Sequence, residues 1–260
     1  MMKRLFAIFV SLLLFHSLSW GTGQKGDVLI LDGEEWEMLC APLEHLDFLT
    51  YDSLEKACDW EMLSTANYRG HVAYWYVSDG KLYLEKVVTY DNGPKECDYN
   101  VILKILDRYN DNGKICAQWM TRNIIVGRGK TVRYDHAGFN RDYEEEIVVS
   151  VTNGQAFLSQ VYHNHSIQSS LEERMKLEQY LKAFPSDSYG QEKGPVMAIY
   201  DDTSGKWTVK LLKPASSVAK DELEKDLAKY LNDYPEEIGC FIRGEWSHFN
   251  FVFSLSEGFL

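Results

Sequence analysis

The sequence predicts an α+β protein in which antiparallel sheets carry packed helices. Three observations lead to this prediction. Strand-like runs rich in Val, Tyr and Trp flank the turns Asp79-Gly80 and Asn153-Gly154, which signal hairpins because both turn positions need positive φ. Segments with apolar residues at helical spacing lie between such runs. The hydrophobic share of 45% is ordinary for a globular protein and excludes wholesale disorder.

Residues 1–21 have the layout of a secretory signal peptide. A basic start at Lys3 and Arg4 precedes an apolar run, and small residues surround a cleavage site after Gly21. The apolar run is short for a bilayer-spanning helix. We therefore expect a periplasmic or secreted protein with no membrane insertion after signal removal. A lipoprotein is not expected, because the first cysteine is Cys40.

The charge balance argues against two classes of partner. The chain has 27 basic and 39 acidic residues, and loss of Lys3 and Arg4 with the signal takes the net charge from −12 to −14. Such an acidic surface repels phosphate backbones and anionic lipid headgroups. We therefore expect no nucleic-acid partner and no binding to a membrane surface.

Five cysteines follow the predicted cleavage site, so at most two disulfides and one free thiol can form within the chain. Cys97 and Cys116 bracket a predicted helix and are a candidate disulfide pair, but the sequence does not fix the connectivity. Five small buried hydrophobic residues are the alternative. No C-x-x-C spacing supports a zinc or thioredoxin-type site. The cysteines are Cys40, Cys58, Cys97, Cys116 and Cys240.

The first predicted hairpin covers residues 71–87 and turns at Asp79-Gly80. This turn fixes the register, because a closed two-residue loop sets which residues face each other. Cross-strand pairs of this kind stabilise a sheet by about 0.2–1 kcal/mol each. The predicted pairs are Val77–Leu82 and Trp75–Leu84 on the core face, and Tyr76–Tyr83 and Tyr74–Glu85 on the opposite face.

The remaining elements follow in order along the chain. Residues 77–87 align without a gap to residues 151–161, which predicts a second hairpin that brings Leu158, like Leu84, to a shared core. A capping box at Ser170 and Glu173 begins the third helix. The predicted helices cover residues 51–62, 98–109, 171–184 and 217–234, and the later strands are a hairpin over 196–212 and two strands over 238–246 and 248–255.

Two groups of residues are candidates for ligand binding. Tyr74, Tyr76 and Tyr83 form a flat amphipathic row that can bind a sugar or peptide, although we expect helix 98–109 to cover it. Arg69 precedes Gly70 at the start of this strand. It either packs, by stacking on a tyrosine or pairing with an acid, or contacts a ligand.

The motif His163-Asn164-His165 is the candidate metal site. On an extended strand both imidazoles point to one side, so they can share a metal. A third ligand is not near in sequence, so we expect a solvated loop and no metal or other cofactor. No nucleophile elbow, phosphate loop or selected pair of carboxylates occurs, so we expect a protein that binds rather than catalyses.

The chain resembles a known family in one central stretch and in the layout of its C-terminal part. The stretch "STANYRGHVAYWYVSDGKLYLEKV" resembles the "STACWRGYxAxWEI" core of a family of uncharacterised exported Bacteroidetes proteins. Asn67 stands where the family usually has Cys and Tyr68 where it has Trp, so a bridge through that Cys cannot form here. Residues 171–255 are similar in layout to a divergent TonB C-terminal-like domain of αββαββ order.

The resemblance implies a module type rather than an activity. TonB C-terminal-like domains bind extended peptide segments beside their sheet, through the main-chain groups of a strand edge. We therefore expect an N-terminal β-rich domain over residues 22–168, a TonB C-terminal-like domain over 169–260, and a protein or peptide partner at the cell envelope. The alternative is a carbohydrate-binding or hydrolytic protein that uses the Tyr74, Tyr76 and Tyr83 face.

Overall fold

A computed structural model describes most of the chain after the predicted signal peptide. The described residues are 22–90, 93–134, 137–167, 170–189, 195–212, 217–248, 250–255 and 258–259, so the signal-peptide prediction lies outside them. The chain forms two compact units. The described part of unit 1 comprises residues 22–90, 93–128, 134, 137–141 and 147–160, and unit 2 comprises 129–133, 142–146 and the described residues from 161 onward.

Unit 1 carries most of the strands. The α+β prediction is confirmed, because helices and sheets are both present. Its elements are β1 (Asp27–Leu31), β2 (Glu34–Met38), η1 (Pro42–His45), α2 (Phe48–Cys58), β3 (His71–Ser78), β4 (Lys81–Thr89), β5 (Lys95–Glu96), α3 (Tyr99–Ile105), η2 (Asp107–Tyr109), β6 (Asn110–Asp111), β7 (Lys114–Cys116), β8 (Thr121–Tyr134), β9 (Arg141–Thr152) and β10 (Gln155–Leu158), with parts of β8 and β9 belonging to unit 2.

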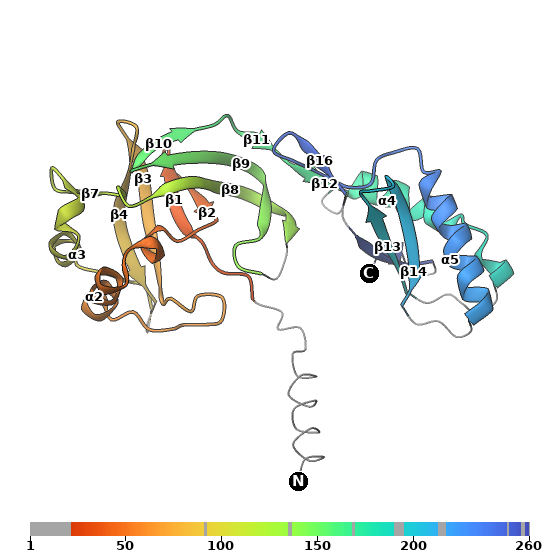
Figure 1. The fold of residues 1–260 in the computed structure, drawn as a ribbon, viewed down its shortest axis with the longest axis horizontal. Helices are drawn as coiled ribbons and strands as arrows, with labels where there is room; N and C mark the ends of the chain where they lie inside the picture. The colour runs from red at the N-terminus through yellow and green to blue at the C-terminus, as the bar shows by residue number, and fades with distance from the viewer. Residues whose placement is uncertain are drawn as a thin grey trace, which may run out of the picture. The chain divides into compact units, whose positions relative to one another are not determined.

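Seven strands close into a barrel (Figure 1). The neighbours run in the order β10-β9-β8-β2-β1-β3-β4, and Gln155 of β10 pairs with Lys81 of β4 to complete the ring. Strand β1 pairs with β3 in parallel, with Leu29 beside Trp75, so the prediction of antiparallel sheets is wrong at this pairing. Closure removes the free edges that an open sheet leaves, because each barrel strand then has a neighbour on both sides.

The two repeated hairpins meet where the barrel closes. The Leu82 N–H donates to the Gly154 carbonyl at 2.9 Å, and the Ala156 N–H donates to the Gly80 carbonyl at 2.8 Å. The turn of each hairpin therefore hydrogen-bonds the first residues of the other hairpin's return strand. Leu84 is buried as predicted, but Leu158 is 41% exposed, and Ala156 occupies the core instead.

The register of the first hairpin is confirmed over three of its four predicted pairs, including Trp75 with Leu84. It fails at Tyr74, which lies opposite Lys86 because a bulge between Tyr74 and Trp75 leaves Glu85 unpaired. The Trp75 side chain is fully buried, as predicted. Helices α2 and α3 add Leu54 and Ile102 to the same core.

Unit 2 contains two smaller sheets and the two longest helices. The four-stranded sheet has the order β14-β13-β17-β18, and a three-stranded sheet has the order β12-β15-β16. Strand β11 instead pairs with β9. The elements are β11 (Tyr162–His163), β12 (His165–Ser166), α4 (Leu171–Lys182), η3 (Ser186–Tyr189), β13 (Pro195–Asp201), β14 (Lys206–Leu211), α5 (Ser217–Asn232), β15 (Cys240–Ile242), β16 (Glu245–Ser247), β17 (Phe251–Ser254) and β18 (Gly258–Phe259).

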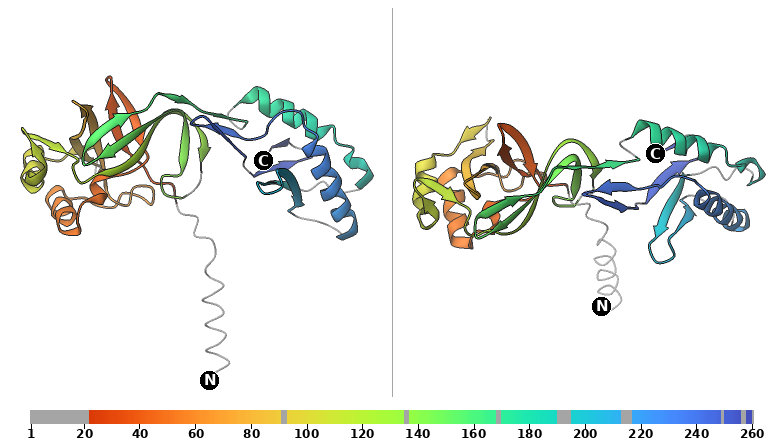
Figure 2. Two further views of the ribbon diagram at one scale, coloured as in Figure 1. Left: turned by 45° about the horizontal axis from the view of Figure 1, so that its top comes forward. Right: turned by 90° about the horizontal axis from the view of Figure 1, so that it is seen from above.

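One face of the four-stranded sheet is buried against the helices, as the views in Figure 2 allow the reader to follow. Alternate residues such as Val196, Val209 and Phe253 join Leu177 of α4 and Leu227 of α5 in a single core cluster. The period of two along the strands and the helical spacing in α4 and α5 produce this two-layer arrangement.

The predicted boundary between the units lay between residues 168 and 169, both of which are outside the described residues. The observed boundary is earlier in the chain. Unit 2 already includes Val161, because Tyr162 pairs with Glu146 and His165 pairs with Phe241. The predicted strand over 238–246 is instead the hairpin β15–β16, which turns at Arg243 with φ of 49°. Among the described residues, no helix is long and apolar enough to span a bilayer.

Candidate functional site

Strand β14 is an edge of the four-stranded sheet in unit 2. Its even-numbered side chains, including Thr208 and Lys210, are exposed, whereas Trp207, Val209 and Leu211 bury theirs in the core. Along a strand, successive main-chain groups point alternately toward each neighbour. The Leu212 N–H donates to the Pro195 carbonyl of β13, so the even-numbered residues of this segment face β13. The odd-numbered residues of β14 therefore direct their N–H and C=O groups away from the sheet.

A single side chain of α5 covers the first of these outward groups. The Asn232 Oδ1 accepts from the Trp207 N–H at 2.8 Å, and Asn232 Nδ2 donates to the Trp207 carbonyl at 2.8 Å. Nδ2 also donates to the Ala228 carbonyl at 2.7 Å, one helical turn earlier. A carboxamide has the donor and acceptor of a peptide group. Asn232 therefore takes the place of one residue of a neighbouring strand.

A second α5 side chain covers the other end of the edge. The Glu224 Oε1 accepts from the Leu211 N–H at 2.7 Å and lies 3.7 Å from the Lys220 ammonium group. Val209 lies between the two covered residues, and among the residues that the structure describes its outward N–H and C=O have no hydrogen-bond partner. The edge is thus satisfied at both ends by side chains of α5, whereas its centre, at the buried Val209, has no hydrogen bond among the described residues.

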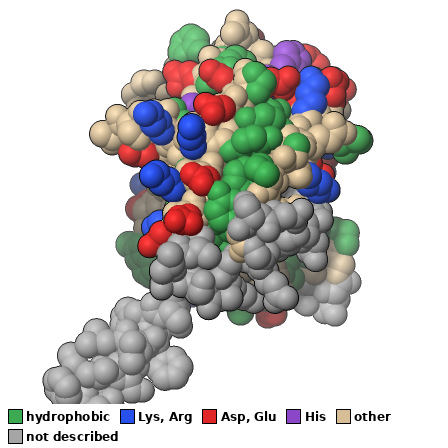
Figure 3. Space-filling view, turned by 90° about the vertical axis from the view of Figure 1, so that its right-hand side faces the viewer, with side chains coloured by type: hydrophobic (Ala, Val, Ile, Leu, Met, Phe, Trp, Pro, Cys, Tyr) green, Lys and Arg blue, Asp and Glu red, His purple; other side chains and the backbone are tan. Residues whose placement is uncertain are grey.

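The position of α5 depends on an aromatic clasp with α4. Tyr180 and Tyr230 stack with ring centroids 4.4 Å apart, and each hydroxyl donates to the main-chain carbonyl of the other tyrosine, at 2.9 and 3.0 Å. Figure 3 views this side of unit 2 and shows a narrow hydrophobic band bordered by charged side chains. The clasp holds α5, and with it Asn232 and Glu224, against the sheet.

Arg69 lies in the core of unit 1. Its Nη2 is 3.0 Å from the Asp27 Oδ1, and both side chains are 0% exposed. Asp27 also accepts from the Trp75 indole at 3.0 Å and from the Ala73 N–H at 3.1 Å. Burial raises the pKa of Asp27 to about 6, although the Arg69 charge opposes this shift. Arg69 thus pairs with an acid, one of the arrangements expected for it.

The three predicted tyrosines differ in exposure. Tyr83 is buried and its hydroxyl donates to Asp111 at 2.7 Å, whereas Tyr74 and Tyr76 are half-buried. Tyr76 and Tyr83 stack with ring centroids 5.5 Å apart, and the Lys114 ammonium group lies 5.8 and 5.5 Å from the two centroids. The stacked pair and its cation occupy the ring faces that a sugar would need.

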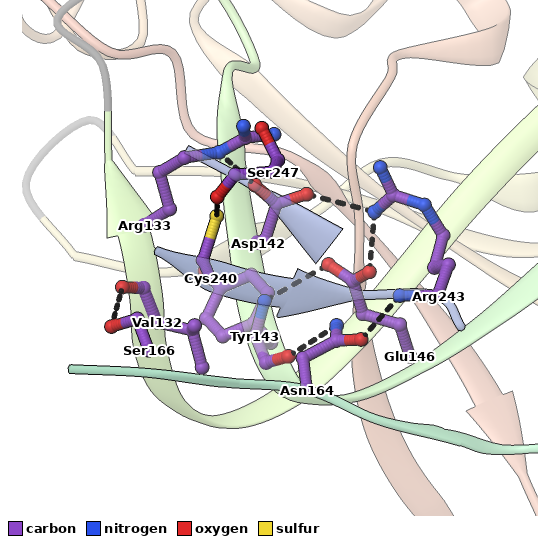
Figure 4. Close-up of polar contacts among 10 residues, drawn as sticks. All are labelled: Val132, Arg133, Asp142, Tyr143, Glu146, Asn164, Ser166, Cys240, Arg243 and Ser247. Carbon is purple, nitrogen blue, oxygen red and sulfur yellow. Dashed lines mark hydrogen bonds and ion pairs between the residues drawn. The ribbon is translucent and has the colours of Figure 1, made fainter. Parts of the chain in front are cut away.

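The predicted histidine pair lies in unit 2, in sequence on either side of Asn164, a buried residue that Figure 4 labels. Asn164 accepts from the Arg243 N–H at 2.7 Å and donates to the Tyr143 carbonyl at 2.8 Å. His163 is exposed beside Glu145, and His165 is exposed beside aromatic rings of β15 and β16. Within the described residues, no group of three His, Cys, Asp or Glu side chains can hold a metal ion.

The polar cluster around this asparagine is an ion-pair network (Figure 4). The Arg243 guanidinium contacts Asp142 at 2.7 Å and also pairs with Glu146, while Arg133 Nε contacts Asp142 at 2.6 Å. Burial raises the pKa of Glu146, and the positive charge of Arg243 opposes this rise. The four charges pair with one another, so the cluster fixes the β15–β16 turn rather than offering a reactive group.

Comparisons with known proteins add no family to this geometry. The chain matches no protein-family model, no curated protein and no solved structure.

Asn232 and Glu224 were not among the predicted site residues. Leu223, Leu227 and Leu231 have helical spacing in the sequence, and the structure buries all three in α5. Asn232 and Glu224 each follow one of these leucines directly. A polar residue one position beyond a core leucine lies at the margin of the buried face, which is the signal that points to an edge contact.

Proposed function

We propose that this protein is an exported binding protein, and that unit 2 is a TonB C-terminal-like domain that binds an extended peptide segment of an envelope protein along strand β14. The bound segment adds a strand to the sheet, so its main-chain groups supply the affinity. No chemical reaction is assigned to the site.

The observation that carries the proposal is the way β14 is covered. Side chains, rather than another strand, hold the outward groups of Trp207 and Leu211, and the outward groups of Val209 have no partner among the described residues. A net hydrogen bond contributes only about 0.5–1.5 kcal/mol, so a peptide that offers a continuous row of bonds can displace Asn232 and Glu224.

A proline substitution tests the proposal at its centre. Val209→Pro removes the outward N–H and leaves the hydrogen bonds to β13 in place, because those bonds come from even-numbered residues. Peptides are first selected on the full mature protein from a library of random linear peptides. Their affinities are then measured by fluorescence anisotropy, and a photo-reactive residue at Lys210 records contact with β14.

The expected result is loss of peptide binding in Val209→Pro and retention of binding in Val209→Ala. The alanine variant is the control, since it also alters the buried side chain but keeps the N–H. Asn232→Ala should bind more tightly than the unmodified protein, because a competitor for the edge is gone. Equal affinities for the proline and alanine variants would refute the proposal.

A further inference from the structure

Two cysteines of unit 1 that lie far apart in the sequence meet between its helices. Cys58 is the last residue of α2, which ends at Asp59 in a left-handed conformation with φ of 50°. Cys97 directly precedes Asp98, whose side chain caps α3. The Cys97 N–H donates to the Val87 carbonyl at 2.9 Å, which ties this segment to β4.

Helices α2 and α3 pack against each other, and the side chains of Cys58 and Cys97 are hydrogen-bond partners. Both residues belong to the same hydrophobic cluster and are only 7% and 8% exposed. All five cysteines are present as buried thiols.

Cys116, the partner suggested for Cys97 by the sequence, has different surroundings. Cys116 is the last residue of β7 and packs beside the turn of the second hairpin. A Cβ added at Gly154 would come 2.9 Å from the Cys116 sulfur. Cys40 lies near Asp27, and burial, followed by the charge of Asp27, raises the pKa of Cys40. Cys240 contacts the Ser247 carbonyl in unit 2.

We propose that Cys58 and Cys97 form an intramolecular disulfide, and that Cys40, Cys116 and Cys240 remain thiols. The oxidant is a disulfide of another molecule, such as oxidised glutathione or a protein disulfide. The Cys97 thiolate attacks one sulfur of that disulfide and releases the other as a thiol. The Cys58 sulfur then loses its proton and attacks Cys97 in the mixed disulfide. The Cys58–Cys97 bond forms, and the oxidant leaves as its second thiol, reduced by two electrons.

The environment of Cys97 suits the attacking role. The hydrogen bond from Cys58 lowers the pKa of Cys97 to about 7, which increases the share of thiolate at neutral pH. The predicted export signal also directs the chain to a compartment where disulfides persist. The link joins the end of α2 to the start of α3 and leaves the barrel strands unmodified.

The sequence makes the pairing easy to read. Trypsin cleaves after Lys and Arg, so each cysteine falls in a different peptide. Cys58 lies in ACDWEMLSTANYR (residues 57–69) and Cys97 in ECDYNVILK (residues 96–104). Cys40, Cys116 and Cys240 lie in the peptides 26–56, 115–122 and 230–243.

The experiment oxidises the full mature protein with oxidised glutathione during refolding, blocks free thiols with N-ethylmaleimide in denaturant and digests without reductant. The expected result is one cross-linked product of peptides 57–69 and 96–104, with maleimide on the other three cysteines. A second measurement compares melting temperatures with and without reductant. Reduction should lower the Tm of the unmodified protein and of Cys116→Ala but leave the Tm of Cys58→Ala unchanged.

Two outcomes would overturn the assignment. A cross-link between peptides 96–104 and 115–122 would instead support the pairing of Cys97 with Cys116. Maleimide on all five cysteines after oxidative refolding would show that no disulfide forms. Cys116→Ala is the matched control because it also removes a buried thiol from unit 1.

Discussion

The sheets of the two units satisfy their polar edges in different ways. In unit 1 the sheet closes on itself, and main-chain groups of Gly80 and Gly154 bond the strands of the opposite hairpin. In unit 2 the four-stranded sheet stays open, and Asn232 and Glu224 cover its β14 edge with side chains. Only side-chain covers can be exchanged for an incoming strand without dismantling the sheet. The comparison therefore separates an edge closed by main-chain pairing from an edge covered by side chains, which is the one that the proposed function uses.

The largest expected effect concerns the buried ion pair of unit 1. Arg69→Met removes the charge that faces Asp27, and breaking a buried pair costs about 3–5 kcal/mol because one charge stays buried without its counterion. We expect urea unfolding, followed by tryptophan fluorescence, to show this loss at about pH 7.5. The control is Arg108→Met, which breaks the exposed pair with Asp47 and should change stability little.

The same variant has a defined pH dependence. The pKa of Asp27 in the folded protein, about 6, is above the unfolded value of 3.8. The folded state therefore binds this proton more tightly, and the resulting stability is present below pH 3.8 and is lost as the pH rises through 6. Loss of Arg69 raises the pKa of Asp27 further. The destabilisation of Arg69→Met should thus shrink between about pH 7.5 and about pH 5, and a constant difference would contradict the pairing.

An intermediate effect distinguishes the two repeated hairpins. Gly80 and Gly154 have φ of 69° and 79°, so alanine at either site meets the left-handed penalty of about 1–2 kcal/mol. A Cβ at Gly80 meets nothing within 4 Å, whereas one at Gly154 comes 2.9 Å from the Cys116 sulfur and 3.1 Å from main-chain atoms. Gly154→Ala should be the more destabilising by about 1–3 kcal/mol in urea unfolding. Equal losses of stability in Gly80→Ala and Gly154→Ala would contradict the closer packing of the second turn.

The smallest expected effect concerns the cover of β14. Asn232→Ala removes the hydrogen bonds to the Trp207 N–H and C=O, which should reduce stability by about 1–2 kcal/mol. Amide exchange measured by NMR should become faster at Trp207. The Leu211 amide is an internal control, because its acceptor is Glu224. Unchanged exchange at Trp207 would argue that Asn232 does not hold the edge.

Local signals in the sequence predicted much of the fold. Asp79-Gly80 fixed the first hairpin up to the bulge after Tyr74, and the apolar spacing found α4 and α5 within a few residues of their ends. Strands β1 and β2 flank the same Asp-Gly turn signal, at Asp32-Gly33, but were not predicted. Closure of the barrel depends on pairing between distant strands, which local patterns do not encode.

The site was harder to predict than the fold. Arg69 and the tyrosines were predicted as ligand-binding residues from their residue types. In the structure, however, Arg69 is buried and pairs with Asp27, and Tyr83 is buried and donates to Asp111. Asn232 and Glu224 are ordinary helical surface residues in sequence. Their importance arises from the distance between α5 and the edge of β14, which only the folded chain defines. The histidines were predicted in a solvated loop. Both are exposed, but the loop prediction is wrong, because His163 lies in strand β11 and His165 in strand β12.

The closed barrel also has a consequence for the order in which the chain can fold. Strand β4, at residues 81–89, gains its neighbour β10 only when residues 155–158 are available. Until then Lys81, at the start of β4, lacks this partner, whereas β7 and β5 pair with later residues of the strand. Contacts between residues so distant in sequence form slowly. A chain synthesised from its N-terminus therefore passes through a stage in which the barrel is still open, and the Asp-Gly and Asn-Gly turns shorten that stage by forming each hairpin early.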